Sequence, residues 1–267
     1  MLLYKIMVTY KVKYKNYIAN LYIPEQKSGK VILLLPGLPP STNIEKMLSI
    51  LLSTGAVVYF PNFSGFIDSG GIFGAKNSIK DVAELYNLAT KSRVKELYFG
   101  KEIEIGKVKE VILIGTSFSS IVALLGHKDK FDKMILLSSA LLFNPKDFPT
   151  KELGKNFADQ MKSLLSLLKN AFPFSCRTGK NSDLKDFLLG RSPLSQKKSV
   201  VDALNKLKIS TLVLHGKNDT SIPVEIIESI QKNIESPYIT WEYTDSAHST
   251  SSYKEDSQKV ITDFILN

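Results

Sequence analysis

Apolar residues are concentrated in short runs along the chain, and segments with helical spacing of apolar residues separate these runs. Runs that are apolar throughout predict strands buried on both faces of a parallel sheet. Such strands are expected at residues 30–35, 56–60, 110–114, 134–137 and 211–214. Alternating polar and apolar residues predict two N-terminal strands at 4–14 and 17–23, and a last strand is expected at 238–243.

Helical spacing fills the intervals between these strands. Met47, Leu48 and Leu51 fall on one face of a segment that Ser41 would cap and that ends near Thr54. The same kind of spacing predicts helices at 79–94, between Ser117 and Gly126, after Pro223, and at 252–266. Strands that alternate with helices imply a parallel sheet with right-handed crossovers. We therefore expect an α/β fold with a mostly parallel central sheet that helices flank on both faces.

Residues 142–205 interrupt this alternation. The segment has short amphipathic patterns separated by prolines, and it contains no buried strand. We expect residues 1–141 and 206–267 to form the core domain and 142–205 to form a small helical cap over one end of the sheet. This cap would control the choice of substrate. Its phenylalanines either line a pocket or pack the short helices onto the core (Phe143, Phe148, Phe157, Phe172, Phe174 and Phe187).

Length and composition agree with one large globular domain. The chain has 267 residues, of which 43% are hydrophobic, and its mean hydropathy is -0.02. No apolar run reaches the roughly 18 residues that a membrane-spanning helix requires, and the alternating N-terminus lacks the apolar core of a signal peptide. Cys176 is the single cysteine, so an internal disulfide is excluded. We expect a cytoplasmic protein without a membrane span.

Net charge does not identify a partner. The formal charge is +9, from 35 basic and 26 acidic residues, but the lysines are spread along the chain and form no basic block with interleaved aromatics. This distribution is typical of a solvated surface, so we expect no nucleic-acid partner. No histidine, cysteine or carboxylate cluster has metal-ligand spacing, and glycines 70, 71 and 74 lack dinucleotide spacing. We therefore expect neither a metal nor a cofactor.

The segment around Ser117 is the first candidate for chemistry. The apolar run 110–114 ends at Gly115, Ser117 follows two residues later, and a helical pattern begins after it. A serine at the apex of a strand–turn–helix is exposed and lies at a helix N-terminus, which favours a developing anion. Ser119 is a small residue at a position where a second glycine is usual. The same pattern also occurs in ordinary helix capping.

A nucleophilic serine needs a base that accepts its proton and an acid that orients the base. Of the three histidines, His248 lies between the last predicted strand and the last helix. Asp219 lies in the loop after the strand at 211–214. Asp245 is an alternative acid, but it precedes His248 by only three residues. Because the carboxyl ends of parallel strands meet at one edge of a sheet, we expect Ser117, Asp219 and His248 to lie together.

The oxyanion that forms in such a reaction needs two backbone N–H donors. Phe118 would supply one, as the residue after the serine. Leu38 would supply the other from the loop 36–40, which follows the predicted strand at 30–35. Gly37 permits a close approach of this loop. The alternative is a simple Pro-Gly turn.

These segments resemble the α/β-hydrolase superfamily from about residue 17 to the C-terminus. Residues 36–41 look like its His-Gly oxyanion segment, with Pro36 in place of the histidine. Residues 62–70 look like its loop with arginine and glycine, with Ser64 in place of the arginine and Ile67 in place of a glycine.

The segments around the acid and the base also match that superfamily. The resemblance implies that Ser117 is the nucleophile, Asp219 the orienting acid and His248 the general base. We expect a serine hydrolase that cleaves carboxylic esters of short to medium acyl chain, with a small-molecule acyl substrate and an acyl-enzyme. A peptidase or acyl-aminoacyl hydrolase, a thioesterase, and a non-catalytic binding protein of this fold are the alternatives. The sequence indicates no oligomeric state.

Overall fold

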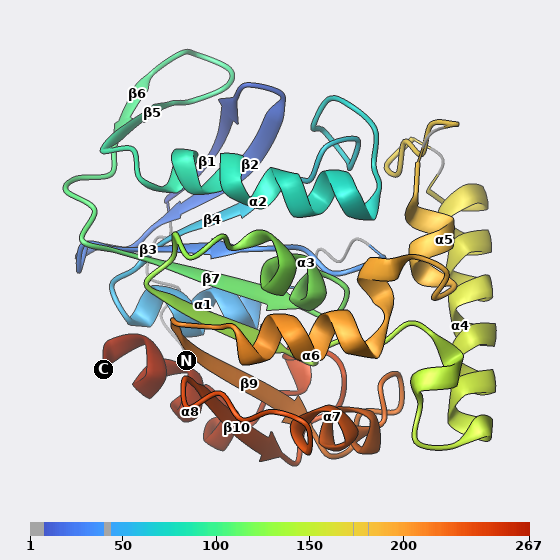
Figure 1. Cartoon of the computed structure of the whole chain (residues 1–267). Coiled ribbons are helices and arrows are strands. Elements are labelled where there is room, and N and C mark those ends of the chain that lie inside the picture. The colour runs from blue at the N-terminus through green and yellow to red at the C-terminus, as the bar shows by residue number, and fades with distance from the viewer. Residues whose placement is uncertain (1–7, 40–43, 173, 181) are drawn as a thin grey trace.

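The computed structural model describes residues 8–39, 44–172, 174–180 and 182–267 (Figure 1). The strands of its main sheet are β1 (Val8–Tyr14), β2 (Tyr17–Ile23), β3 (Lys30–Leu34), β4 (Val57–Pro61), β7 (Glu110–Thr116), β8 (Lys133–Leu137), β9 (Ser210–Gly216) and β10 (Ile239–Thr244). Eight strands follow one another in the order β1-β2-β4-β3-β7-β8-β9-β10. β1 and β2 pair antiparallel, β2 pairs antiparallel with β4, and the pairs from β4 to β10 are parallel. The predicted α/β fold is confirmed.

Helices cover both faces of the sheet (Figure 1). On one face lie α1 (Glu45–Ser53) and α8 (Glu255–Leu266). On the other lie α2 (Ala75–Ala89), α3 (Ser119–Gly126), α6 (Lys197–Asn205) and α7 (Val224–Gln231).

Strand β7 illustrates why the central runs are apolar throughout. Val111 and Leu113 belong to the core under α2 and α3, whereas Ile112 and Ile114 belong to the core under α1 and α8. Each face of the strand is covered, so successive side chains are all buried and the alternation of a half-exposed strand is lost.

The helix predicted at 79–94 was wrong at both ends, and the helix predicted at 252–266 begins three residues later, at Glu255. The helix expected at 79–94 is α2, which begins at Ala75 and ends at Ala89. A residue that is remote in the sequence caps its first turn, because the Asp183 carboxylate accepts the Lys76 N–H at 3.1 Å. The first helix begins at Glu45, and the Ser41 that was expected to cap it lies outside the described residues, as do residues 4–7 of the first predicted strand.

After α2 the chain forms a short hairpin that lies outside the main sheet. Its strands are β5 (Arg93–Lys95) and β6 (Glu102–Glu104), which pair antiparallel. The alternation of Glu102, Ile103 and Glu104 matches this strand, since only the isoleucine is buried. The hairpin is also joined to the edge strand β1, where Glu96 pairs with Val12.

The segment 142–205 contains η1 (Pro145–Asp147), α4 (Lys151–Asn170), α5 (Leu184–Leu188), η2 (Pro193–Ser195) and α6. Figure 1 shows α4 and α5 beyond the carboxyl ends of the parallel strands, whereas α6 lies on the sheet beside α3. The division into a core and a cap at 142 and 205 stays a prediction. Phe143 and Phe187 are buried with ring centroids 5.1 Å apart, so these two rings pack the insertion, whereas Phe174 is 86% exposed.

Gly115 generates a stability prediction, because β7 and the start of α3 approach closely there. A Cβ at Gly115 would lie 2.5 Å from the Ser119 carbonyl oxygen and 2.8 Å from Ser120 Cα, both of them backbone atoms. Gly115→Ala should therefore lower the free energy of unfolding by about 1–3 kcal/mol, measured by urea denaturation. Gly70→Ala is the matched control, since its Cβ would meet nothing closer than 3.6 Å. Equal stabilities of the two variants would contradict the prediction.

Candidate active site

Ser117 occupies the turn between β7 and α3 with a φ of +53°. Few residues other than glycine adopt this left-handed conformation, and it persists only where the surroundings hold it. Backbone hydrogen bonds hold it here. The Ser117 N–H donates to the Leu137 carbonyl at 2.9 Å, and the Ser117 carbonyl accepts from the N–H groups of Ser120 (3.0 Å) and Ala140 (3.2 Å).

Ser119 contributes to this turn through its hydroxyl, which the sequence interpretation treated only as small. Its buried Oγ accepts the Thr116 N–H at 2.7 Å and lies 3.0 Å from the Thr116 carbonyl and 3.1 Å from the Leu35 carbonyl. The hydroxyl therefore connects the turn to the end of β3. A serine in the first turn of a helix is itself a signal for such capping.

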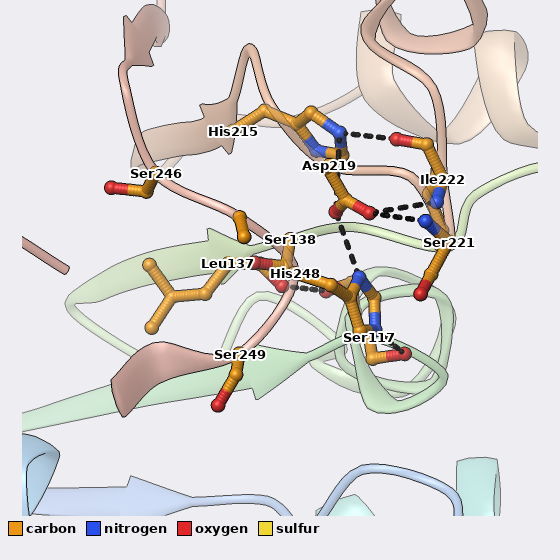
Figure 2. Close-up of polar contacts among 12 residues, drawn as sticks. Ser117, Leu137, Ser138, His215, Asp219, Ser221, Ile222, Ser246, His248 and Ser249 are labelled. Atoms are coloured by element: carbon orange, nitrogen blue, oxygen red, sulfur yellow. Dashed lines mark hydrogen bonds and ion pairs between the residues drawn. The ribbon is translucent and has the colours of Figure 1, made fainter. Parts of the chain in front are cut away.

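A chain of hydrogen bonds joins the three predicted site residues (Figure 2). His248 lies on the loop after β10, and its Nε2 is 3.0 Å from Ser117 Oγ. Its Nδ1 is 2.7 Å from Asp219 Oδ2. The buried Asp219 carboxylate also accepts two N–H groups on Oδ1, from Ser221 (2.9 Å) and Ile222 (2.8 Å). A carboxylate partner is an acceptor, so Nδ1 carries the proton and Nε2 is left to accept from the serine hydroxyl.

The loops that carry the acid and the histidine are in direct backbone contact. A Cβ at Gly216 would lie 2.1 Å from the Ser246 carbonyl oxygen, so this approach requires a glycine. The same carbonyl accepts the Asn218 N–H at 3.1 Å. The register between these loops, and with it the pairing of Asp219 with His248, is therefore set by the backbone.

Asp245, the alternative acid, lies elsewhere. Its carboxylate is 66% exposed and is 4.0 Å from the Lys217 ammonium. Only two residues lie between Asp245 and His248, yet the structure brings Asp219 and not Asp245 to the imidazole.

His215 is a residue near the site to which the sequence interpretation gave no role. It is fully buried at the end of β9, its Nε2–H donates to the Ile222 carbonyl at 2.8 Å, and Nε2 is 3.6 Å from Asp219 Oδ2. Among the described residues, its Nδ1 has no hydrogen-bond partner. Burial lowers the pKa of His215, so it is neutral and holds the loop of Asp219 without adding charge. The feature of the sequence that could have indicated this role is a histidine at the end of the predicted strand, directly before Gly216.

The two predicted oxyanion donors lie on segments that adjoin Ser117. The loop after β3 contacts the turn, since a Cβ at Gly37 would lie 3.7 Å from Ser117 Cβ. Phe118 immediately precedes α3. Within the described part of the chain, the N–H groups of Leu38 and Phe118 have no hydrogen-bond acceptor. Their role as oxyanion donors stays a prediction.

Ser64, at the position where the resemblance would place an arginine, binds a buried carboxylate. Its N–H and hydroxyl donate to the buried Asp81 carboxylate at 2.7 and 2.8 Å, and the Tyr17 hydroxyl donates to the same group at 2.9 Å. Burial raises the pKa of Asp81. An arginine reaches this loop from the insertion instead, because Arg177 donates to the Ile67 carbonyl at 2.8 Å.

The single cysteine and the arrangement of potential metal ligands bear on which other chemistry is available. Cys176 is buried, and burial raises the pKa of its thiol to about 11, which leaves it protonated and unreactive at neutral pH. Among the residues that the structure describes, no group of three histidine, cysteine or carboxylate side chains is arranged to hold a metal ion. No helix in the described ranges is long and apolar enough to cross a bilayer.

Comparison with known proteins identifies the fold. No protein-family model and no curated protein matches the sequence. Solved structures do match: an esterase from Pyrococcus furiosus (17% identity, TM-score 0.65) covers 97% of this chain and 90% of its own. An esterase from Exiguobacterium antarcticum (18%, 0.59) covers 97% and 98%, and a monoacylglycerol lipase from Paleococcus ferrophilus (14%, 0.60) covers 98% of each chain. The chain has the α/β-hydrolase fold.

The buried His215 generates a prediction on stability and pH. Because its pKa is lowered in the folded state, the unfolded chain binds the proton more readily below about pH 6.5. The free energy of unfolding should therefore fall as the pH decreases from there. His215→Gln keeps an N–H donor for Ile222 but cannot titrate, so its stability should fall less between about pH 7.5 and pH 5, by up to ~1.4 kcal/mol per pH unit. The prediction would be contradicted if urea denaturation gave the same decrease in the free energy of unfolding between these pH values for both proteins.

Proposed function

We propose that this protein is a serine hydrolase that cleaves carboxylic esters of short to medium acyl chain. The observation that carries the proposal is the hydrogen-bonded series Ser117–His248–Asp219, with the serine on a left-handed turn at the start of α3. A serine, a histidine and a buried carboxylate in this order and geometry form the arrangement that activates a hydroxyl for attack on an acyl carbonyl.

In the proposed reaction, His248 Nε2 accepts the Ser117 proton as Oγ attacks the carbonyl carbon. The imidazolium that forms is stabilised by Asp219, whose buried carboxylate is already fixed by two backbone N–H groups. His248 then donates the proton to the departing alcohol, and an acyl-enzyme remains on Ser117. Water attacks this acyl-enzyme with His248 as the base, which releases the carboxylic acid and restores the serine.

The negative charge of the tetrahedral intermediate would develop beside the N–H groups of Phe118 and Leu38. Both are backbone donors, so they need no side-chain reorganisation during the reaction. Phe118 also lies at the N-terminus of α3, where the helix dipole favours an anion. The proposed chemistry requires neither a metal nor an organic cofactor.

The preference for esters over other acyl substrates rests on two points. The solved structures of similar fold include esterases and a monoacylglycerol lipase, although a shared fold alone does not determine a substrate. A peptidase or acyl-aminoacyl hydrolase is the second candidate. In the loop 62–70, where the resemblance would place an arginine, this chain has Ser64, and Ser64 binds Asp81. This difference favours the ester assignment. A thioesterase is the third. We propose a small-molecule acyl substrate, and a cytoplasmic location stays a prediction from the single cysteine.

A substrate panel separates these candidates. Purified protein should hydrolyse p-nitrophenyl esters from acetate to octanoate with a higher kcat/KM than matched acyl thioesters and acyl-aminoacyl anilides. A higher kcat/KM for the thioesters or the anilides would replace the ester assignment. Absence of turnover, together with no labelling by a fluorophosphonate, would favour a non-catalytic binding protein.

Removal of the nucleophile or the base tests the core of the proposal. Ser117→Ala and His248→Ala should each lower kcat by a factor on the order of 10⁶, and the double variant should be no worse than either single one, since these residues act as a unit. Fluorophosphonate labelling, detected by intact mass, should disappear in Ser117→Ala. Near-wild-type hydrolysis by a folded Ser117→Ala protein would place the nucleophile elsewhere.

The two candidate aspartates provide a matched pair of variants. Asp219→Asn keeps the shape of the orienting group but favours the wrong imidazole tautomer, so kcat should fall by roughly 10⁴. Asp245→Asn removes an exposed carboxylate that contacts only Lys217 among the described ion pairs, and kcat should stay near the wild-type value. The reverse ranking would assign the orienting role to Asp245.

A further inference from the structure

The hairpin β5–β6 presents two aromatic side chains to solvent. Tyr98 is 69% exposed and Phe99 is 92% exposed, and both lie in the turn between the strands. We call these two residues the aromatic tip. Figure 1 shows the hairpin at the opposite end of the sheet from α4 and α5, and therefore far from the carboxyl ends of the parallel strands. The site described above does not explain the aromatic tip.

The backbone of this turn is held in one conformation. Glu96 is buried, and its carboxylate accepts the Tyr98 N–H at 2.8 Å and the Phe99 N–H at 2.6 Å. The Glu96 N–H donates to the Lys101 carbonyl at 2.9 Å, and the Leu97 N–H donates to the Lys11 carbonyl of β1 at 2.7 Å. A buried carboxylate thus orders a turn whose side chains remain uncovered. The backbone of such an ordered turn loses little conformational entropy when its side chains are buried against a partner.

Three exposed lysines lie near the aromatic tip. Lys95 and Lys101 flank it and are exposed, and neither forms an ion pair with a described carboxylate. Lys13 is exposed on the adjacent strand β1. Two nearby carboxylates lie beside cations, because Asp68 pairs with Lys11 at 2.6 Å and Glu102 lies 4.0 Å from Arg93. The Glu96 carboxylate is buried under the turn and bonded to its N–H groups, and Glu104 is exposed on β6. The three lysines therefore outnumber the two carboxylates that have no cationic partner among the described ion pairs.

We propose that the aromatic tip and its flanking lysines dock on the surface of an anionic lipid bilayer. Aromatic side chains partition to the headgroup region of a bilayer, and lysines close to the surface are attracted by anionic lipids. This hairpin combines both kinds of attraction. Docking through this end leaves the site of Ser117 facing water, so the protein would act on soluble acyl compounds while bound to a membrane.

Vesicle flotation tests the proposal. The full chain should float with vesicles of equal parts phosphatidylglycerol and phosphatidylcholine, and much less with pure phosphatidylcholine. Replacement of the tip by Tyr98→Ser and Phe99→Ser should lower the partition coefficient about tenfold. Lys95→Gln with Lys101→Gln should lower it as well, and this loss should be smaller in high salt, which screens the attraction. Phe174→Ser, which removes an aromatic ring that is 86% exposed in the insertion, is the matched control and should bind as the wild type does.

A spectroscopic probe and an activity control complete the test. The indole introduced by Phe99→Trp should show a blue-shifted emission and quenching by brominated lipid when anionic vesicles are added. Ser117→Ala should bind vesicles normally, and the tip variants should hydrolyse a soluble ester at the wild-type rate, so docking and catalysis are tested separately. The proposal is overturned if the wild type does not bind anionic vesicles or if the tip variants bind equally well. A dimer or a nucleic-acid complex that depends on the tip, in the absence of vesicle binding, would also overturn it.

Discussion

The left-handed turn at Ser117 is the constraint on which the site depends. A serine with a φ of +53° is held there by the backbone of β8 and by the hydroxyl of Ser119. Gly115 lets α3 start close to β7, because any Cβ would meet the backbone of Ser119 and Ser120. Release of this turn would move the hydroxyl away from the imidazole and would also move the Phe118 N–H, so the proposed nucleophile and oxyanion donor share one support.

A second support is the contact between the loops after β9 and β10. Gly216 brings the backbones of these loops together, and the buried His215 holds the loop of Asp219 through Ile222. The carboxylate is thereby fixed before any substrate binds. In the proposed reaction this preorganisation matters, because the acid stabilises the charge that develops on the imidazole without a free-energy cost of reorganisation.

The insertion, residues 142–205, contacts the segments around the site. Asp183 caps α2, and Arg177 binds the loop after β4. The Phe187 ring packs edge-on against Phe118, with centroids 6.0 Å apart, and Phe118 is the proposed oxyanion donor. The sequence interpretation assigned the insertion to substrate choice alone. This contact adds a physical route by which it also acts on the position of the donor.

Local sequence determined the strands, the order of the site residues and the turn chemistry. Buried strands such as β7 have an apolar pattern that needs no knowledge of their neighbours, and the placement of Ser117, Asp219 and His248 after separate strands follows from parallel topology alone. Tertiary structure decided what depends on distant partners. The start of α2 needed Asp183, the function of Ser64 needed Asp81, and the choice of Asp219 over Asp245 needed the contact at Gly216. The physical reason is that capping, hydrogen bonding of buried polar groups and backbone contact act over a few ångströms in space, between residues that the chain holds far apart.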